Sequence, residues 1–335
     1  MKIKSLLFNN LGWHSSFCAT HQHALQDNDT TKLRFILGCG RSGTSWMART
    51  VAESDTPLRY CHEILTYVQP IYSYSRKFDH TATPYLQEID ETSSLASSFS
   101  VTTSPLVNWE KLLPGRERQV QRNDTDFEVV LHKEVHSLLA AEGMVRLFKD
   151  NKFVFVVRNP ILNIDSLFNY HPLSAIIWRN EYDYIKKRAF CNRFLDPEQA
   201  AMLKRMQRIY KDDGAERRST ISAKVITVAI INTMLIKLAR EYKNVMLVRY
   251  EDLCLDPQKM FLHVCDFLGL EFNENRLENV LHSQKKKKSI DPMSIDKNSK
   301  MQIERKMYFL STEEVDHLSL LLEQLGYEGM YNVRN

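Results

Sequence analysis

Short apolar runs alternate with helical patterns along much of the chain. The runs cover 33–37, 127–131, 153–157 and 245–248, and each is followed by polar residues and then by a helical pattern. A further strand is predicted at 59–63, after the first helical stretch. Strands that alternate with helices pair in parallel and bury both faces of their sheet. The pattern therefore predicts a single α/β domain with a central parallel sheet flanked by helices.

Three segments interrupt this alternation. Residues 1–31 are polar and turn-rich and indicate a weakly structured leader, so the predicted domain covers 32–335. Residues 66–125 are rich in Ser, Thr and Tyr, and residues 171–218 are helical in pattern with many Arg, Lys and Tyr. We interpret these two segments as insertions that carry substrate contacts, and extra packing helices are the alternative.

The composition limits the classes of protein that the sequence can encode. With 335 residues and 43% hydrophobic content, the chain is large enough to bury one extensive core. Its 45 basic and 41 acidic residues give a formal net charge of +4. Because that excess is too small to hold a polyanion by bulk electrostatics, we expect no nucleic-acid partner.

Cysteine spacing and hydropathy exclude further classes. The six cysteines form no Cys-x-x-Cys pair, and no Cys and His cluster has the spacing of a zinc site, so we expect reduced structural thiols and no metal. The apolar run at residues 5–8 is too short for a signal peptide, and no later run reaches about 18 apolar residues. The sequence therefore predicts a soluble, cytoplasmic protein without a membrane span.

A glycine-rich loop lies between the first predicted strand and the helical stretch at 44–53. It reads Gly38-Cys39-Gly40-Arg41-Ser42-Gly43-Thr44-Ser45, which has the spacing of a P-loop. In such a loop, consecutive backbone N–H groups and a helix N-terminus surround an anion. Thr44 replaces the lysine that nucleotide triphosphatases carry after the last glycine, which argues against ATP or GTP chemistry. A tight turn without a ligand is the alternative.

A second candidate anion site follows the strand at 153–157. That strand ends in Arg158-Asn159-Pro160, and Ser166 lies eight residues after the arginine in the next helical stretch. Pro160 suits the first helical turn, where no backbone donor is needed. Because open α/β sheets bind ligands at the carboxyl ends of their strands, we interpret Arg158 and Ser166 as ligands of one anion. The alternative is an arginine paired with a surface carboxylate.

In these motifs the sequence resembles the sulfotransferases that use 3′-phosphoadenosine 5′-phosphosulfate (PAPS). Residues 40–46 resemble that family's 5′-phosphosulfate loop, residues 156–160 with Ser166 resemble its 3′-phosphate motif, and residues 248–257 resemble its late strand and turn. The resemblance implies a single α/β domain with a P-loop-like sheet. It also implies PAPS as co-substrate, 3′-phosphoadenosine 5′-phosphate (PAP) as product, and no metal.

The resemblance further assigns roles to single residues. The loop would hold the 5′-phosphosulfate, while Arg158 and Ser166 would hold the 3′-phosphate. Arg41 would stabilise the negative charge that builds on the departing phosphate oxygen. The loop residues concerned are Gly40, Arg41, Ser42, Gly43, Thr44, Ser45 and Trp46.

The acceptor hydroxyl needs a base, and the sequence offers competing candidates. A positioned base typically contributes about 10²- to 10⁴-fold to the rate. We favour Glu63, at the end of the predicted strand 59–63, because it resembles the glutamate proposed as base in carbohydrate sulfotransferases. His132 competes because a histidine in the following strand region serves the cytosolic enzymes, and His62 or another residue is a third possibility. Lys133 either faces the sulfate or the acceptor, or is a surface residue.

Departures from the family pattern bear on the acceptor. Cytosolic enzymes that act on small phenols carry lysine where this chain has Arg41, and the arginine form is closer to carbohydrate, tyrosylprotein and bacterial sulfotransferases. The late Arg-Lys-Gly segment of the cytosolic enzymes is missing here, and the lysine run 285–288 lies at a comparable place. That run contacts the nucleotide or an acidic acceptor, or it is simply solvated. We expect a hydroxylated natural product or an oligosaccharide as acceptor, with the aromatic residues of segment 170–188 stacking on it or packing in the core.

Two other interpretations stay open at this point. A P-loop kinase or NTPase would need the missing lysine and a strand that ends in a magnesium-binding aspartate. A non-catalytic nucleotide-binding protein would keep the loop without turnover, and the presence of Arg41, Glu63 and His132 counts against it. The sequence predicts no oligomeric state.

Overall fold

The structure is a computed structural model of the chain. Most of the predicted leader, much of both predicted insertions, the aromatic segment at 171–184, and Lys287 and Lys288 lie outside the described residues, so the predicted domain boundaries stay predictions. The described residues are 29–64, 99, 101–103, 120–124, 126–135, 137–170, 185, 188–211, 217–286 and 309–327.

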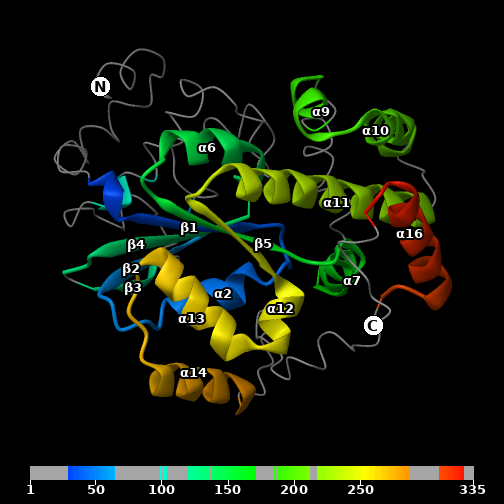
Figure 1. The fold of residues 1–335 in the computed structure, drawn as a ribbon. Coiled ribbons are helices and arrows are strands. Elements are labelled where there is room, and N and C mark those ends of the chain that lie inside the picture. The colour runs from blue at the N-terminus through cyan, green and yellow to red at the C-terminus, as the bar shows by residue number, and fades with distance from the viewer. Residues whose placement is uncertain are drawn as a thin grey trace, which may run out of the picture.

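The described strands form one six-stranded sheet with the order β3-β2-β4-β1-β5-β6 (Figure 1). Five of them are parallel, which confirms the predicted sheet, and β3 runs antiparallel to β2 at the edge. This edge strand lies inside the predicted insertion 66–125 and was not predicted. The strands are β1 (Leu33–Gly38), β2 (Leu58–His62), β3 (Val120–Asn123), β4 (Val129–Glu134), β5 (Lys152–Val157) and β6 (Val245–Arg249).

Helices cover both faces of the sheet (Figure 1). One face carries α2 (Thr44–Val51), α12 (Tyr250–Leu255) and α13 (Pro257–Leu268), with α14 (Glu274–Lys286) outside them. The other face carries α6 (Ala141–Leu147), α7 (Pro160–Tyr170), α9 (Arg188–Phe194), α10 (Pro197–Lys211), α11 (Arg217–Glu241) and α16 (Thr312–Gln324). Short 3-10 turns lie at Thr30–Lys32, Val101–Thr103 and Leu138–Ala140.

The two faces of the sheet bury separate hydrophobic cores. Successive side chains of a strand point to opposite faces, so Phe35 and Leu37 of β1 join the core under α6, α7 and α11. Ile36 between them joins the core under α2, α12 and α13. All three side chains are fully buried. Because both faces of β1 are covered, the strand reads as a continuous apolar run rather than an alternating one.

Helix α11 is the central helix of the larger core. Its segment Thr220–Glu241 is long and apolar enough to cross a membrane, which the sequence analysis did not anticipate because isolated polar residues such as Asn232 interrupt the apolar run. However, 94% of the apolar window is buried inside the protein. The helix packs against β5, β6, α7, α10 and α16, so its apolar character serves the core.

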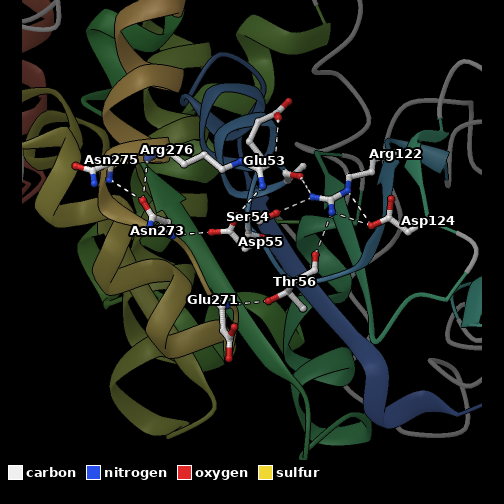
Figure 2. A network of polar contacts seen from close by, with 11 residues as sticks. Glu53, Ser54, Asp55, Thr56, Arg122, Asp124, Glu271, Asn273, Asn275 and Arg276 are labelled. Carbon is white, nitrogen blue, oxygen red and sulfur yellow. Dashed lines mark hydrogen bonds and ion pairs between the residues drawn. The ribbon is translucent and has the colours of Figure 1, made fainter.

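Arg122 of β3 joins this edge strand to the turn between α2 and β2, at the amino ends of the parallel strands (Figure 2). Its guanidinium group donates to the main-chain carbonyls of Ala52 at 2.6 Å, Ser54 at 2.8 Å and Thr56 at 3.2 Å. These carbonyls belong to the turn between α2 and β2. The guanidinium also pairs with Asp124 at 2.8 Å, and this carboxylate accepts from the first N–H of β2. An edge strand thereby holds the end of α2.

The same turn is joined to α14 on its other side (Figure 2). Asp55 accepts from Asn273 N at 2.7 Å and from Arg276 Nη1 at 2.6 Å. The main-chain N–H of Asp55 donates to Glu271 O at 2.8 Å. These contacts lie at the edge of the sheet opposite the candidate site, so they serve the fold rather than the chemistry.

Candidate active site at the carboxyl edge of the sheet

The two predicted anion sites lie side by side at the carboxyl edge of the sheet. Gly38 ends β1 in register with Val156 of β5, so the loop after β1 and the turn after β5 leave the sheet at adjacent positions. Arg158 Nη1 donates to the main-chain carbonyl of Arg41 at 2.9 Å. Arg41 Nε donates to Ser166 Oγ at 3.2 Å. The structure therefore brings together three side chains that the sequence placed in two separate motifs.

Two glycines shape the loop over the end of β1. A Cβ atom on Gly38 would lie 2.4 Å from the carbonyl oxygen of Val156 and 2.7 Å from Ser42 Oγ. Gly43 has a φ of 97°, and a Cβ atom there would lie 2.3 Å from Cδ2 of the Tyr250 ring. A side chain would clash at either position, so glycine allows the loop to curl tightly against its neighbours.

Helix α2 begins directly behind the loop. Its first intrahelical bond runs from Met47 N to Gly43 O at 3.0 Å, so the N–H groups of Thr44 and Ser45 have no acceptor within the helix. The hydroxyl of Ser42 is buried and has no hydrogen-bond partner within the described part of the chain. These donors and the positive end of the helix dipole make the loop suited to an anion.

Arg158 is the buried cation of the second predicted site. The residue is 6% exposed, and its guanidinium carbon lies 4.4 Å from the centroid of the Tyr250 ring. Its Nε has no hydrogen-bond partner among the described residues. A buried donor without an acceptor is costly, and a guanidinium group can bind two phosphate oxygens at once. The residues present therefore fit a nucleotide with a second phosphate beside the loop.

Trp46 was expected among the nucleotide ligands, and the structure places its ring in the core. The residue is 8% exposed. Its ring packs edge-on against Tyr250 and Phe261, with centroids 6.2 Å and 5.5 Å away. Trp46 thus supports the loop from the side of α2 and α13, and its contact with a nucleotide stays a prediction.

Arg41 and Glu63, which were predicted for charge stabilisation and proton removal, share an unusual backbone conformation. Their φ angles are 69° and 52°, and they are the two non-glycine residues with positive φ in the described part of the chain. The left-handed region costs a residue with a Cβ atom on the order of 1–2 kcal/mol. Such strain persists where the surroundings hold it, often at functional sites.

Glu63 directly follows β2 and is held by β4. Its N–H donates to Lys133 O at 2.8 Å, and its carboxylate forms an ion pair with Lys133 Nζ. The Lys133 side chain is 2% exposed, whereas that of Glu63 is 24% exposed. Burial lowers the pKa of the Lys133 ammonium, and the Glu63 carboxylate opposes that shift. The pair therefore anchors a carboxylate that still reaches the surface.

His62 lies behind Glu63 and is held by Tyr60. Tyr60 OH lies 2.7 Å from His62 Nδ1, and both residues are buried. His62 Nε2 lies 3.8 Å from Glu63 Oε1. Burial and then the nearby Lys133 ammonium lower the pKa of His62 to about 4. Burial also raises the pKa of the Tyr60 phenol, so the tyrosine and the histidine form a neutral hydrogen-bonded pair behind the carboxylate.

His132, the competing base, lies two residues before the end of β4. It is fully buried, its ring stacks on Phe35 with centroids 5.6 Å apart, and its Nε2 lies 2.9 Å from Thr102 Oγ1. Burial and then the charge of Arg59 lower the pKa of His132 to about 3. Since side chains alternate along a strand, His132 faces the sheet surface opposite to Lys133. Its role as base stays a prediction, and the geometry favours Glu63.

Three residues of this region were not predicted as site residues. Tyr250 packs on Arg158. Glu251 and Asn232 bond the peptide group that follows Arg158. For Tyr250 and Glu251 the signal was their place in the late motif of residues 248–257. For Asn232 it was a polar side chain within an apolar helix.

No cluster of three or more His, Cys, Asp or Glu side chains that could hold a metal ion occurs in the part of the chain that the structure describes. The described cysteines are free thiols, and four of them are buried, namely Cys39, Cys61, Cys254 and Cys265. Burial raises the pKa of the Cys61 thiol to about 12 and that of Cys254 to about 11. Such protonated thiols are structural rather than reactive.

Comparison with protein families identifies a sulfotransferase domain over residues 33–317. This match covers more than half of the chain and includes the loop, Arg158, Ser166 and the late motif. No curated protein matches the sequence.

Among solved structures, the fold is similar to several sulfotransferases. The sulfotransferase domain of the Synechococcus PCC 7002 olefin synthase is 18% identical, with a TM-score of 0.39 over 87% of this chain and 94% of that one. Sulfotransferase STF9 from Mycobacterium avium is 14% identical, with a TM-score of 0.43 over 98% of this chain and 84% of that one. Mouse sulfotransferase SULT7A1 complexed with PAP is 12% identical, with a TM-score of 0.39 over 91% and 88%.

Proposed function

The chain belongs to the sulfotransferase family, and we propose that it transfers a sulfuryl group from PAPS to a hydroxyl group of an acceptor. The observation that carries this proposal is the buried guanidinium of Arg158, which bonds the loop carbonyl of Arg41 and keeps an unused donor. Two adjacent anion sites suit a nucleotide with phosphates at both the 3′ and the 5′ positions. ATP would leave the second site empty.

The loop and α2 would hold the 5′-phosphosulfate. In the transfer, the bond between sulfur and the bridging phosphate oxygen breaks, and a bond between sulfur and the acceptor oxygen forms. The departing phosphate keeps the electron pair, so negative charge grows where the N–H groups of Thr44 and Ser45 lie. Arg41, which bonds Ser166 in this structure, supplies a permanent positive charge next to them.

Glu63 would accept the proton of the acceptor hydroxyl. The end of β2 lies two strands from the end of β1, which corresponds to about 10 Å, and we place the acceptor over this part of the edge. Lys133 and His62 hold the carboxylate from its buried side, so its accessible part faces the acceptor. We further propose a hydroxylated natural product or an oligosaccharide as acceptor, which rests on the arginine form of the loop. A cytoplasmic location stays a prediction from the sequence.

The rival kinase or NTPase function finds no support in the loop. Thr44, which replaces the Walker lysine, is 2% exposed and starts α2. The lysine that would reach a β- or γ-phosphate is therefore replaced at this position by a neutral, buried side chain. The sulfotransferase interpretation needs no such lysine.

Calorimetric titration of the purified protein tests the proposal. PAP and ATP are titrated separately, each with magnesium and with a chelator. We expect tight binding of PAP that survives the chelator, followed by transfer of labelled sulfate from PAPS to one member of an acceptor panel. Binding of ATP alone, and only with magnesium, would overturn the proposal in favour of a kinase or NTPase. PAP binding without transfer to any acceptor would favour a non-catalytic nucleotide-binding protein.

A further inference from the structure

Residues Tyr250 and Glu251 lie where they can control the second anion site. They open α12 immediately after β6, and Val157 of β5 pairs in register with Arg249 of β6. Arg158 and Tyr250 therefore follow paired residues of neighbouring parallel strands and leave the sheet at the same edge. Their side chains meet there.

The ring of Tyr250 is packed between the loop and Arg158. The guanidinium carbon of Arg158 lies 4.4 Å from the ring centroid, within the range of a cation–π contact. On the loop side, a Cβ atom on Gly43 would lie 2.3 Å from the ring, so the backbone of the last loop glycine rests directly on it. Tyr250 is 8% exposed and cannot move far without displacing one of these neighbours.

The peptide group between Arg158 and Asn159 is bonded at both of its polar atoms. Asn232 Nδ2 donates to Arg158 O at 2.9 Å, and Asn159 N donates to Glu251 Oε1 at 2.9 Å. Asn159 Oδ1 in turn accepts from Ile161 N at 2.9 Å and fixes the first turn of α7. Side chains from α11 and α12 thus set the orientation of this peptide.

These contacts leave the phosphate-binding capacity of Arg158 available. Its Nη1 bonds Arg41 O, while its Nε has no partner among the described residues. The guanidinium carbon lies over the ring of Tyr250, and no hydrogen bond from Arg158 to this ring takes up its Nε. Tyr250 and Glu251 therefore constrain the direction of Arg158 and do not consume its donors.

We propose that Tyr250 and Glu251 are positioning residues that aim Arg158 at the 3′-phosphate and thereby make the site selective for nucleotides that carry one. This inference rests on the proposed function, because it assigns the 3′-phosphate of PAPS to Arg158. It goes beyond that function in naming residues that do not touch the nucleotide but set its selectivity.

The test compares PAP with adenosine 5′-monophosphate (AMP), which differs only in lacking the 3′-phosphate. The readout is the ratio of their dissociation constants in calorimetry, measured on the full chain. Tyr250→Leu removes the ring, and we expect PAP affinity to fall at least about tenfold while AMP affinity changes less than about threefold, because an interaction with the second phosphate is lost. Tyr250→Phe keeps the ring and should keep the selectivity of the parent protein.

Glu251 provides a second pair of variants that does not depend on the packing of the ring. Glu251 is partly exposed, so Glu251→Ala should fold even if Tyr250→Leu does not. We expect Glu251→Ala to reduce selectivity for PAP, because Asn159 N loses its acceptor. Glu251→Gln keeps an oxygen that can accept from Asn159 N, so this variant should retain the selectivity for PAP. Circular dichroism confirms that each variant is folded.

The outcomes separate the two proposals. If the parent protein binds PAP and AMP equally, the proposed function fails. If the parent is selective but Tyr250→Leu and Glu251→Ala weaken both nucleotides equally, or leave both unchanged, the positioning role fails and the function stands. A purely structural role predicts the equal weakening, since it disturbs the loop and Arg158 together.

Discussion

At the scale of single residues, Glu63 allows chemistry to be separated from binding. Glu63→Gln preserves the shape of the side chain and its capacity to accept from Lys133, but removes the basic carboxylate. We expect kcat to fall about 10²- to 10⁴-fold, because the acceptor proton loses its base. The dissociation constant for PAP should change less than about twofold, since the loop lies two strands away. Single-turnover kinetics with labelled PAPS measures the first quantity, and calorimetry measures the second.

Glu53 provides the matched control for this substitution. Its carboxylate is 57% exposed and lies at the amino edge of the sheet, near Arg276 (Figure 2). Glu53→Gln should leave both kcat and PAP affinity unchanged. An unchanged kcat in Glu63→Gln would show that Glu63 is not the base, and His132 would then be the next candidate.

The proposed role of Arg158 allows recognition of the two phosphates to be tested separately. Arg158→Ala removes the buried guanidinium, so PAP should bind at least about tenfold more weakly, because a charge-assisted contact is worth about 1.5–3 kcal/mol. Adenosine 5′-phosphosulfate lacks the 3′-phosphate and should lose little affinity. Competition binding against a fluorescent nucleotide measures both. Equal losses for the two nucleotides would contradict the assignment of Arg158 to the 3′-phosphate.

The sequence named these candidate residues but did not predict which side chains they contact. Arg41, Arg158 and Ser166 were predicted from spacing and resemblance, and the structure places them in contact. The sequence favoured Glu63 over His132 by resemblance alone, because hydrophobic periodicity does not show which polar side chains near a strand end reach the site. The positive φ of Arg41 and Glu63 had no sequence signal, since it depends on the loop geometry around each residue.

At the scale of elements, apolar runs predicted four of the five parallel strands to within a few residues, and β2 was predicted from its place after the first helical stretch. Strand β3 was missed because Val120-Gln121-Arg122-Asn123 is short and polar, and its residues alternate between partly buried and exposed. An edge strand pairs on one side only, so its sequence carries little hydrophobic signal. Its stability depends instead on contacts such as those of Arg122, which no local pattern predicts.

Arg122 is therefore expected to matter for stability and not for binding. Arg122→Met keeps the aliphatic stem but leaves the carbonyls of Ala52, Ser54 and Thr56 without their donor. We expect the free energy of unfolding to fall by on the order of 2–3 kcal/mol. Urea unfolding followed by circular dichroism measures this change, and PAP affinity of the folded variant should stay the same because the contacts lie at the opposite edge of the sheet.

Arg276 is the matched control within the same network (Figure 2). It pairs with Asp55, and both side chains are more than a third exposed, at 44% and 36%. Exposed pairs contribute about 0–1 kcal/mol, so Arg276→Met should cost less than about 1 kcal/mol. Equal losses for Arg122→Met and Arg276→Met would show that the carbonyl contacts of Arg122 are not the source of its effect.

At the scale of the whole molecule, the unpredicted features join segments far apart in the chain. Asn232 bonds the carbonyl of Arg158, 74 residues away, and Glu251 bonds Asn159, 92 residues away. Periodicity reports on neighbours three or four positions apart in a helix, or two apart in a strand. It therefore predicts the order of layers but not which side chains meet when the sheet assembles.

The two buried histidines give the whole fold a dependence on pH. Both His62 and His132 have depressed folded-state pKa values, about 4 and about 3, whereas an unfolded histidine titrates near 6.5. Below that value the unfolded chain binds more protons than the folded one, so stability falls as pH falls. The stabilisation is complete above about pH 6.5 and is lost towards the folded pKa values.

Between pH 7.5 and pH 5 we expect each histidine to remove about 2 kcal/mol from the free energy of unfolding. Urea unfolding at a series of pH values measures the slope. The double variant His62→Gln and His132→Gln should be less stable at pH 7.5 but should show a markedly shallower slope, because neither glutamine takes up a proton. His263, an exposed histidine of α13, provides the control, and His263→Gln should leave the slope unchanged. If the double variant kept the full slope of unfolding free energy against pH, the acid sensitivity would arise from other groups and not from the buried imidazoles.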